Sequence, residues 1–223
     1  MFLSITKKGF ALAIITLFLS CNNSSSNELS GEIKSNSDSL LLEKDFLTTC
    51  LDNSVELDSA NWYEINPFKD FQSGYLLNDT VINAVYIEEH DTLCDMNLYK
   101  LEAGNWELIT SIQDLEFSSL SYEISFLDFN FDGTNDIFMR TSASNGYVMS
   151  RGHLIEYNLA NNELIIHDEL VEYSNFSINK ETQQLIAESE GYCSNPPFFS
   201  PIITLFEFNE GKFEKVRDYQ NCD

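Results

Sequence analysis

A ten-residue stretch near the middle of the chain, Asp128–Ile137, carries the side chains best suited to bind a metal ion. Oxygen-bearing side chains stand at its positions 1, 3, 5 and 9, which are Asp128, Asn130, Asp132 and Asp136. Gly133 stands at position 6, where a calcium loop turns sharply, and a backbone carbonyl near Thr134 is expected to add a ligand. Calcium takes about six to eight oxygens in irregular geometry, whereas magnesium keeps its waters. The stretch therefore predicts a Ca²⁺ site.

The same residues could also form turns without a metal, because Asp and Asn side chains accept hydrogen bonds from nearby backbone. Three carboxylates that converge on one turn would, however, repel one another without a cation. The sequence therefore favours calcium over a bare turn. We expect a structural ion that fixes a strand connection, bound with a dissociation constant of about 10⁻⁴ to 10⁻³ M, as in other exported modules.

The flanks of this loop predict strands and not the helices of an EF-hand. Position 12, where an EF-hand has a bidentate Glu, is Met139. Residues 122–127 before the loop and 136–140 after it are rich in β-branched and aromatic side chains. Phe129 and Phe131 alternate with the predicted ligands, and we expect both rings to pack into the core.

Similar short runs recur from Tyr75 onward, separated by Asn, Asp and Gly turns. They predict strands at residues 81–87, 96–101, 106–109, 122–127, 136–140, 153–157, 163–166, 176–178, 184–187, 204–208 and 213–216. Closely spaced strands with tight turns indicate an antiparallel all-β architecture, either a β-sandwich or a propeller-like domain of hairpins. Residues 40–51 have apolar side chains near a helical spacing, which allows one short N-terminal helix.

At this point the sequence resembles two kinds of exported protein. Its Asp-x-Asn-x-Asp-Gly-x-x-Asp-Ile loop is similar to the FG-GAP and VCBS repeats, whose loops bind calcium in integrin-like propellers, although only one such loop is present. More closely, residues 75–217 look like small bacterial β-domains related to periplasmic lysozyme inhibitors, on the following segments: 126–137, 142–147, 157–164 and 176–186. The resemblance implies a partner loop at Ser144 to Tyr147. An ordinary Asn-Gly turn explains that segment equally well.

The first twenty residues have the organisation of an export signal. Lys7 and Lys8 precede an uncharged apolar run that is too short for a comfortable membrane span. The run ends in Phe-Leu-Ser-Cys, which resembles the lipobox of bacterial lipoproteins, with Phe18 in place of the usual aliphatic residue. The resemblance implies cleavage after residue 20 and lipidation of Cys21. An ordinary secretory signal or a retained anchor helix are the alternatives.

Lipidation at Cys21 would place the protein on a bacterial cell envelope, on the outer membrane and facing the periplasm or the surface. Two or three acyl chains hold a protein on a membrane where one does so only marginally, so lipid alone is the expected anchor. Residues 21–38 are polar and small, and predict a flexible tether. Residues 39–74 form an N-terminal segment and residues 75–220 the calcium-binding β-domain.

Four cysteines remain after Cys21, and this even number in an exported chain predicts two disulfides. They are Cys50, Cys94, Cys193 and Cys222. Three connectivities are open, and we prefer Cys94 with Cys193, which leaves Cys50 near Cys222. The chain has no CxxC pair or Cys/His cluster, which argues against zinc.

Composition limits the partners. With 36 acidic and 12 basic residues the formal charge is −24, which argues against nucleic acids and anionic membrane surfaces. It suits a cationic partner such as a basic lysozyme, or solubility alone. Hydrolase, phosphate-loop and dinucleotide motifs are absent from the sequence.

The sequence therefore predicts a non-enzymatic, calcium-stabilised binding module that recognises an unknown protein or glycan. Two alternatives stay open. One is a lysozyme inhibitor acting through the loop at Ser144 to Tyr147, and the other is a carbohydrate-active hydrolase, which would need a concave cluster of acids with raised pKa values.

Overall fold

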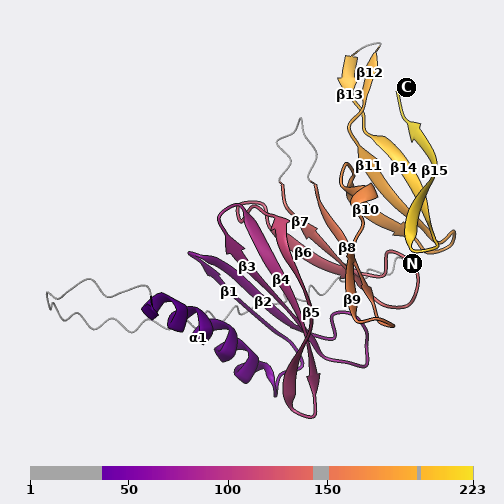
Figure 1. Ribbon diagram of the computed structural model, residues 1–223. Coiled ribbons are helices and arrows are strands. Elements are labelled where there is room, and N and C mark those ends of the chain that lie inside the picture. The colour runs from indigo at the N-terminus through magenta and orange to yellow at the C-terminus, as the bar shows by residue number, and fades with distance from the viewer. Residues whose placement is uncertain (1–36, 143–150, 195–196, 223) are drawn as a thin grey trace, which may run out of the picture. The chain divides into compact units, whose positions relative to one another are not determined.

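Three antiparallel sheets follow one another along the chain in the computed structural model, which describes residues 37–142, 151–194 and 197–222 (Figure 1). Helix α1 (Ser37–Ser54) precedes them. The all-β antiparallel architecture predicted from strand spacing is confirmed, as is a single N-terminal helix. The sheets are meanders, since most neighbouring strands are also consecutive in the sequence.

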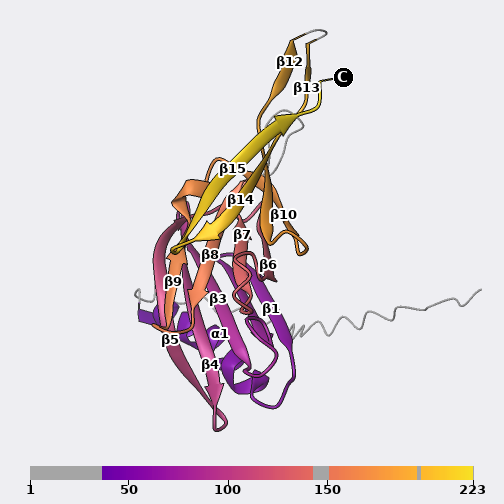
Figure 2. The ribbon, with the colours of Figure 1, turned by 90° about the vertical axis from the view of Figure 1, so that its right-hand side faces the viewer.

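The first sheet has five strands in sequence order: β1 (Ala60–Ile65), β2 (Phe68–Gly74), β3 (Asn83–His90), β4 (Leu93–Glu102) and β5 (Asn105–Glu116). The middle sheet has four: β6 (Glu123–Leu127), β7 (Asp136–Arg140), β8 (Gly152–Asn158) and β9 (Glu163–Ile166). The third sheet, after the short 3₁₀ helix η1 (Asp168–Leu170), contains β10 (Ser174–Asn179), β11 (Gln184–Ser189), β14 (Ile202–Asn209) and β15 (Lys212–Gln220). A small hairpin of β12 (Tyr192–Ser194) and β13 (Pro197–Phe199) lies between β11 and β14 in sequence. It extends past the ends of β14 and β15, beside the C-terminus (Figure 2).

The middle sheet is covered by apolar side chains on both faces. On one face Ile137 and Met139 of β7 share a core with the first sheet, including Ile87 and Met96. On the other face, Phe138 packs with residues of the third sheet. Because side chains alternate across a strand, a strand buried on both faces needs a continuous apolar run. This requirement explains the sequence Ile-Phe-Met in β7.

Helix α1 covers the outer face of the first sheet. Phe46, Leu47 and Leu51 pack against a buried cluster that includes Phe71 and Tyr86. The indole N–H of Trp106 donates to the carbonyl of Leu51 at 2.9 Å, which ties the end of the helix to β5. No helix within the described residues has the length and apolarity needed to cross a bilayer.

Strands begin at Ala60, before the boundary expected at Tyr75. The sequence pattern did not indicate β2 because this strand buries polar residues where a buried strand usually has apolar ones. Lys69 is 2% exposed, and its ammonium lies 3.4 Å from a carboxylate oxygen of Glu88. Asp70 is 4% exposed and accepts a hydrogen bond from the Tyr122 hydroxyl at 2.6 Å. Both of these buried charged groups have a partner, so the strand accommodates them although its hydrophobic pattern is weak.

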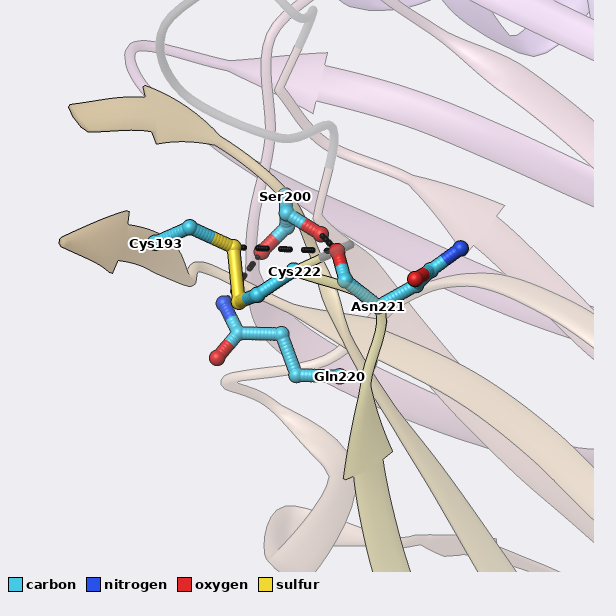
Figure 3. The surroundings of a disulfide bond; sticks show 5 residues. All are labelled: Cys193, Ser200, Gln220, Asn221 and Cys222. Carbon is cyan, nitrogen blue, oxygen red and sulfur yellow. Dashed lines mark hydrogen bonds between the residues drawn. A yellow bond between two sulfur atoms is a disulfide. The ribbon is translucent and has the colours of Figure 1, made fainter. Parts of the chain in front are cut away.

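The expectation of two disulfides, and of a Cys94–Cys193 pair, was wrong. Cys193 bonds to Cys222, which links the small hairpin to the end of the chain (Figure 3). Cys50 and Cys94 are free and buried: Cys50 belongs to α1 and packs against the outer face of the first sheet, and Cys94 lies in the core shared with the middle sheet. Burial raises the pKa of both thiols to about 12, which makes them inert.

Candidate functional site

The predicted calcium loop connects β6 to β7, two paired antiparallel strands. The prediction of flanking strands, and not helices, is therefore confirmed. Gly133, at position 6, has a φ of 90°, and Phe131 has a φ of 64°. A Cβ at Gly133 would meet no atom within 4 Å, so the backbone conformation is what favours glycine there, not lack of space.

Hydrogen bonds between side chains and backbone curl this loop. The Asp128 carboxylate accepts from the N–H groups of Asp132 and Gly133, at 3.1 and 3.0 Å. The Asn130 amide oxygen accepts from the N–H of Asp132 at 3.1 Å, and Asp132 in turn accepts from the N–H of Thr134 at 2.7 Å. A carboxylate or amide oxygen has two lone pairs, so these bonds set the shape of the loop without using all of its ligand capacity.

Asp136 is the loop residue whose partners are incomplete. Its side chain is fully buried, and Oδ2 accepts from the N–H groups of Phe129 and Asn130 at 3.0 and 3.3 Å. Oδ1 is also buried but has no hydrogen-bond partner. Burial raises the pKa of Asp136 to about 7, against the effect of the two N–H donors, and the nearby charge of Asp132 raises it further. A buried carboxylate oxygen without a partner is costly, and a cation is the partner that would satisfy it.

The loop is also attached to both neighbouring sheets. The backbone N–H of Asn135 donates to the carbonyl of Leu77 at 2.6 Å, and its side-chain amide donates to the carbonyl of Leu76 at 2.9 Å. Both acceptors lie between β2 and β3. Phe129 is buried in the core shared with the third sheet, as expected, whereas Phe131 is only partly buried. An ion held in this loop would therefore stabilise the contact of the middle sheet with both others.

The carboxylate oxygens of Asp128, Asp132 and Asp136 lie farther apart than the ligand atoms of one other group of side chains. In the described part of the chain, only His90, Asp95 and Asp114 bring three His, Cys, Asp or Glu ligand atoms within 4.8 Å of one another. Two oxygens on opposite sides of a calcium ion lie up to about 5 Å apart, since each is about 2.5 Å from the metal. The loop carboxylates do not come this close to one another, so a calcium ion there would have to draw their oxygens together.

The group at His90 is explained as an ion pair. Its Nε2 lies 3.0 Å from Asp95 and 3.9 Å from Asp114, and all three side chains are at least one-third exposed. The hydrogen bond to Asp95 raises the pKa of His90, which favours the imidazolium form. A protonated histidine between two carboxylates satisfies all three groups.

Sequence reasoning missed a second buried polar group, centred on His167. Its Nε2 lies 3.1 Å from a carboxylate oxygen of Glu156 in β8, and its Nδ1 lies 3.1 Å from one of Glu169 in η1. Glu169 also accepts from the N–H of Phe213 at 3.0 Å, so the group joins the middle and third sheets. Neither the two glutamates nor the histidine stands at a motif spacing. Only the pairing of β8 with β9 would have indicated that Glu156 and His167 lie close together.

Several predicted site residues lie outside the described residues: Cys21, Ser144 and Tyr147. Lipidation at Cys21 and the role of the Ser144 to Tyr147 loop therefore stay predictions. The five residues of the calcium prediction all lie within the described part, in one loop and at the start of β7.

Comparisons of the chain with protein-family models, with curated proteins and with solved structures find no match.

Proposed function

We propose that this chain is a lipid-anchored, non-enzymatic binding module of a bacterial envelope, stabilised by calcium in the loop between β6 and β7. The observation that carries the calcium part of this proposal is the fully buried Oδ1 of Asp136, which has no partner among the described protein atoms. It belongs to the one loop whose residue types and spacing match a calcium site.

The side chains of Asp128, Asn130, Asp132 and Asp136 and the backbone of Thr134 would hold the ion. Calcium would supply the positive charge that the loop lacks, since none of its residues from Asp128 to Asp136 is basic. The ion would then hold β6 to β7, and Asn135 and Phe129 would transmit that order to the neighbouring sheets. This supports a structural role for calcium and leaves the surface loops free for recognition.

Thermal unfolding of the purified protein with calcium and with a calcium chelator tests this site. At a calcium concentration of about 100 times the dissociation constant, the expected stabilisation is about 2.7 kcal/mol. For a domain of this size that raises the midpoint by about 5 to 10 °C. Magnesium at the same concentration should have a much smaller effect, and equal midpoints with calcium and chelator would contradict the proposal.

The disulfide between Cys193 and Cys222 supports export, because disulfides persist in oxidising compartments. The proposed anchor makes a separate prediction. Cys21→Ser should move the protein from the membrane fraction to the soluble fraction and should prevent labelling by a fatty-acid analogue. Cys50→Ser is the matched control, since that thiol belongs to α1 and is buried against the first sheet. A Cys21→Ser protein that stays fully membrane-bound would rule out lipid as the only anchor.

The acidic surface favours a partner with positive charge or with many hydrogen-bond donors. We propose a protein or a glycan, bound through loops at the ends of the stacked sheets. Such loops carry function because the sheets hold them in place while their own sequence is free to vary.

A further inference from the structure

One exposed group of side chains joins three neighbouring strands of the first sheet. His90 ends β3, Asp95 lies in β4 and Asp114 lies in β5, and these strands pair in that order. One ligand atom from each residue lies within 4.8 Å of the other two. Of the three histidines in the chain, His90 alone is exposed, since His153 is partly buried and His167 is buried. The paired strands hold the three residues, so their spacing is set by the sheet.

A β-bulge turns Asp114 toward this group. Between Cys94 and Met96 the register of β4 and β5 shifts, so that one residue of β4 stands opposite two residues of β5. Ile112 and Leu115 both pack into the core shared with the middle sheet. In a regular strand, two residues three positions apart would face opposite ways. The extra residue therefore leaves Asp114 outside the core, with 71% of its side chain exposed.

The distances within the group agree with those between the ligands of a zinc ion. Nε2 of His90 lies 3.0 Å from Oδ1 of Asp95 and 3.9 Å from Oδ1 of Asp114. Zinc lies about 2.0 to 2.2 Å from imidazole nitrogens and carboxylate oxygens, so two ligands of a tetrahedral ion lie about 3.4 Å apart. The two observed distances fall on either side of this value. The backbone N–H of Asp114 also donates to Oδ1 of Asp95 at 3.1 Å, which fixes that carboxylate.

The ion pair of His90 with the two aspartates is the metal-free form of this group. A proton on Nε2 holds the imidazole between the carboxylates, and a metal ion would take the place of that proton. All three side chains are at least one-third exposed, so an ion can reach them from solvent. An imidazole ligand favours zinc over calcium and magnesium, which prefer oxygen.

We propose that His90, Asp95 and Asp114 bind one Zn²⁺ ion, with water as the fourth ligand. The inference goes beyond the proposed function and does not depend on the calcium loop. The absence of CxxC pairs and Cys/His clusters argued against zinc, but it does not bear on a site of one histidine and two aspartates. Such a set can be recognised only once the three strands are paired.

Isothermal titration calorimetry of Zn²⁺ into the purified full-length protein tests the proposal. The protein is first stripped with chelator and then kept in excess calcium, which fills the loop between β6 and β7. One saturable zinc site is expected. His90→Ala and Asp114→Asn should each weaken it at least tenfold, since even the loss of an outer-shell partner costs about 10- to 100-fold. Both side chains are exposed, so both variants should unfold at the wild-type midpoint when zinc is absent.

Asp91→Asn is the matched control. Asp91 is exposed and follows His90 in the sequence, but it is not one of the three residues whose ligand atoms converge. The substitution removes one negative charge from the same end of the sheet. It should therefore weaken zinc binding much less than either ligand variant does, which separates ligation from general attraction by an acidic surface.

The imidazole signals in long-range ¹H–¹⁵N NMR spectra give a second readout. Zinc should shift the Nε2 signal of His90 and leave those of His153 and His167 in place. The proposal is overturned if zinc gives only heats of dilution at hundreds of micromolar, or if both ligand variants bind zinc like the wild type. It is also overturned if Asp91→Asn weakens binding as much as they do.

Asp136→Asn distinguishes this site from the calcium loop. It should bind zinc like the wild type, because the two sites share no residue. Loss of zinc binding in this variant would place the ion in the calcium loop and overturn the proposal. Zinc binding without any stabilisation by calcium would refute the calcium loop and leave the zinc site standing.

Discussion

Asp136→Asn is expected to abolish the stabilisation by calcium while leaving the calcium-free protein at least as stable as the wild type. The amide keeps an oxygen in place of Oδ2, so the N–H groups of Phe129 and Asn130 keep their acceptor. It removes a carboxylate charge that is fully buried, and a buried charge without a partner is costly. The difference between the two proteins should therefore change sign when calcium is added, as thermal unfolding with calcium and with chelator would show.

Asp136→Ala distinguishes the shape of the loop from its charge. It leaves the same two N–H groups without an acceptor, which should cost about 1 to 3 kcal/mol for each group in chelator, and in calcium the loss of the stabilisation by the ion adds to that cost. Asp52→Asn, on the exposed face of α1, is the matched control and should change neither midpoint. The account of the loop would be wrong if Asp136→Asn responded to calcium as strongly as the wild type does.

His167→Ala should be one of the most destabilising single substitutions in the described part of the chain. Glu156 is 6% exposed and would be left as a buried carboxylate without its partner. Removing one member of a buried ion pair costs about 3 to 5 kcal/mol. Chemical denaturation would measure this loss, and His90→Ala, which removes an exposed imidazole, should leave the midpoint unchanged. A loss no larger than that of the control would show that the two sheets are not joined through His167.

Because folding shifts the pKa of His167, we expect the stability of the protein to depend on pH. Burial opposes protonation of His167, but the hydrogen bond to Glu156 and the charge of Glu169 outweigh it, so its pKa is raised above 6.5. A group whose pKa is raised on folding stabilises the fold fully below its unfolded pKa. That stabilisation is lost as the pH rises through the folded pKa.

His167→Gln isolates this contribution. The free energy of unfolding of the wild type should fall relative to that of the variant as the pH rises above about 6.5, the ordinary histidine value. Glu169 acts in the opposite range: burial opposes its ionisation, but the Phe213 N–H and His167 lower its pKa, so its contribution is lost in acid. Parallel pH profiles for the wild type and His167→Gln would refute the role of His167.

The local features of the loop could be predicted from the sequence because they depend on neighbours in the chain. Residue types from Asp128 to Asp136 set the turn chemistry, the positive φ at Gly133 follows from position 6, and strand-forming residues flank both ends. The burial of Phe129 also follows from simple alternation, whereas Phe131, for which the same alternation predicts burial, is only partly buried. Each of these results needs only a few consecutive residues.

Features that depend on which distant segments meet could not be predicted. Lys69 and Asp70 interrupt the apolar pattern of β2, and their partners come later in the chain, Glu88 from β3 and Tyr122 from just before β6. The disulfide partner of Cys193 depends on where the chain end lies, since Cys222 follows β15. His90, Asp95 and Asp114 stand at no motif spacing, and they meet only once β3, β4 and β5 pair.

Isothermal titration calorimetry of calcium into chelator-treated protein measures binding to the loop between β6 and β7 directly. We expect one saturable site with a dissociation constant of about 10⁻⁴ to 10⁻³ M. We further expect that Asp132→Asn weakens this site and that Asp136→Asn removes it. Heats indistinguishable from dilution for the wild type, or a site that survives both substitutions unchanged, would contradict a calcium site in this loop.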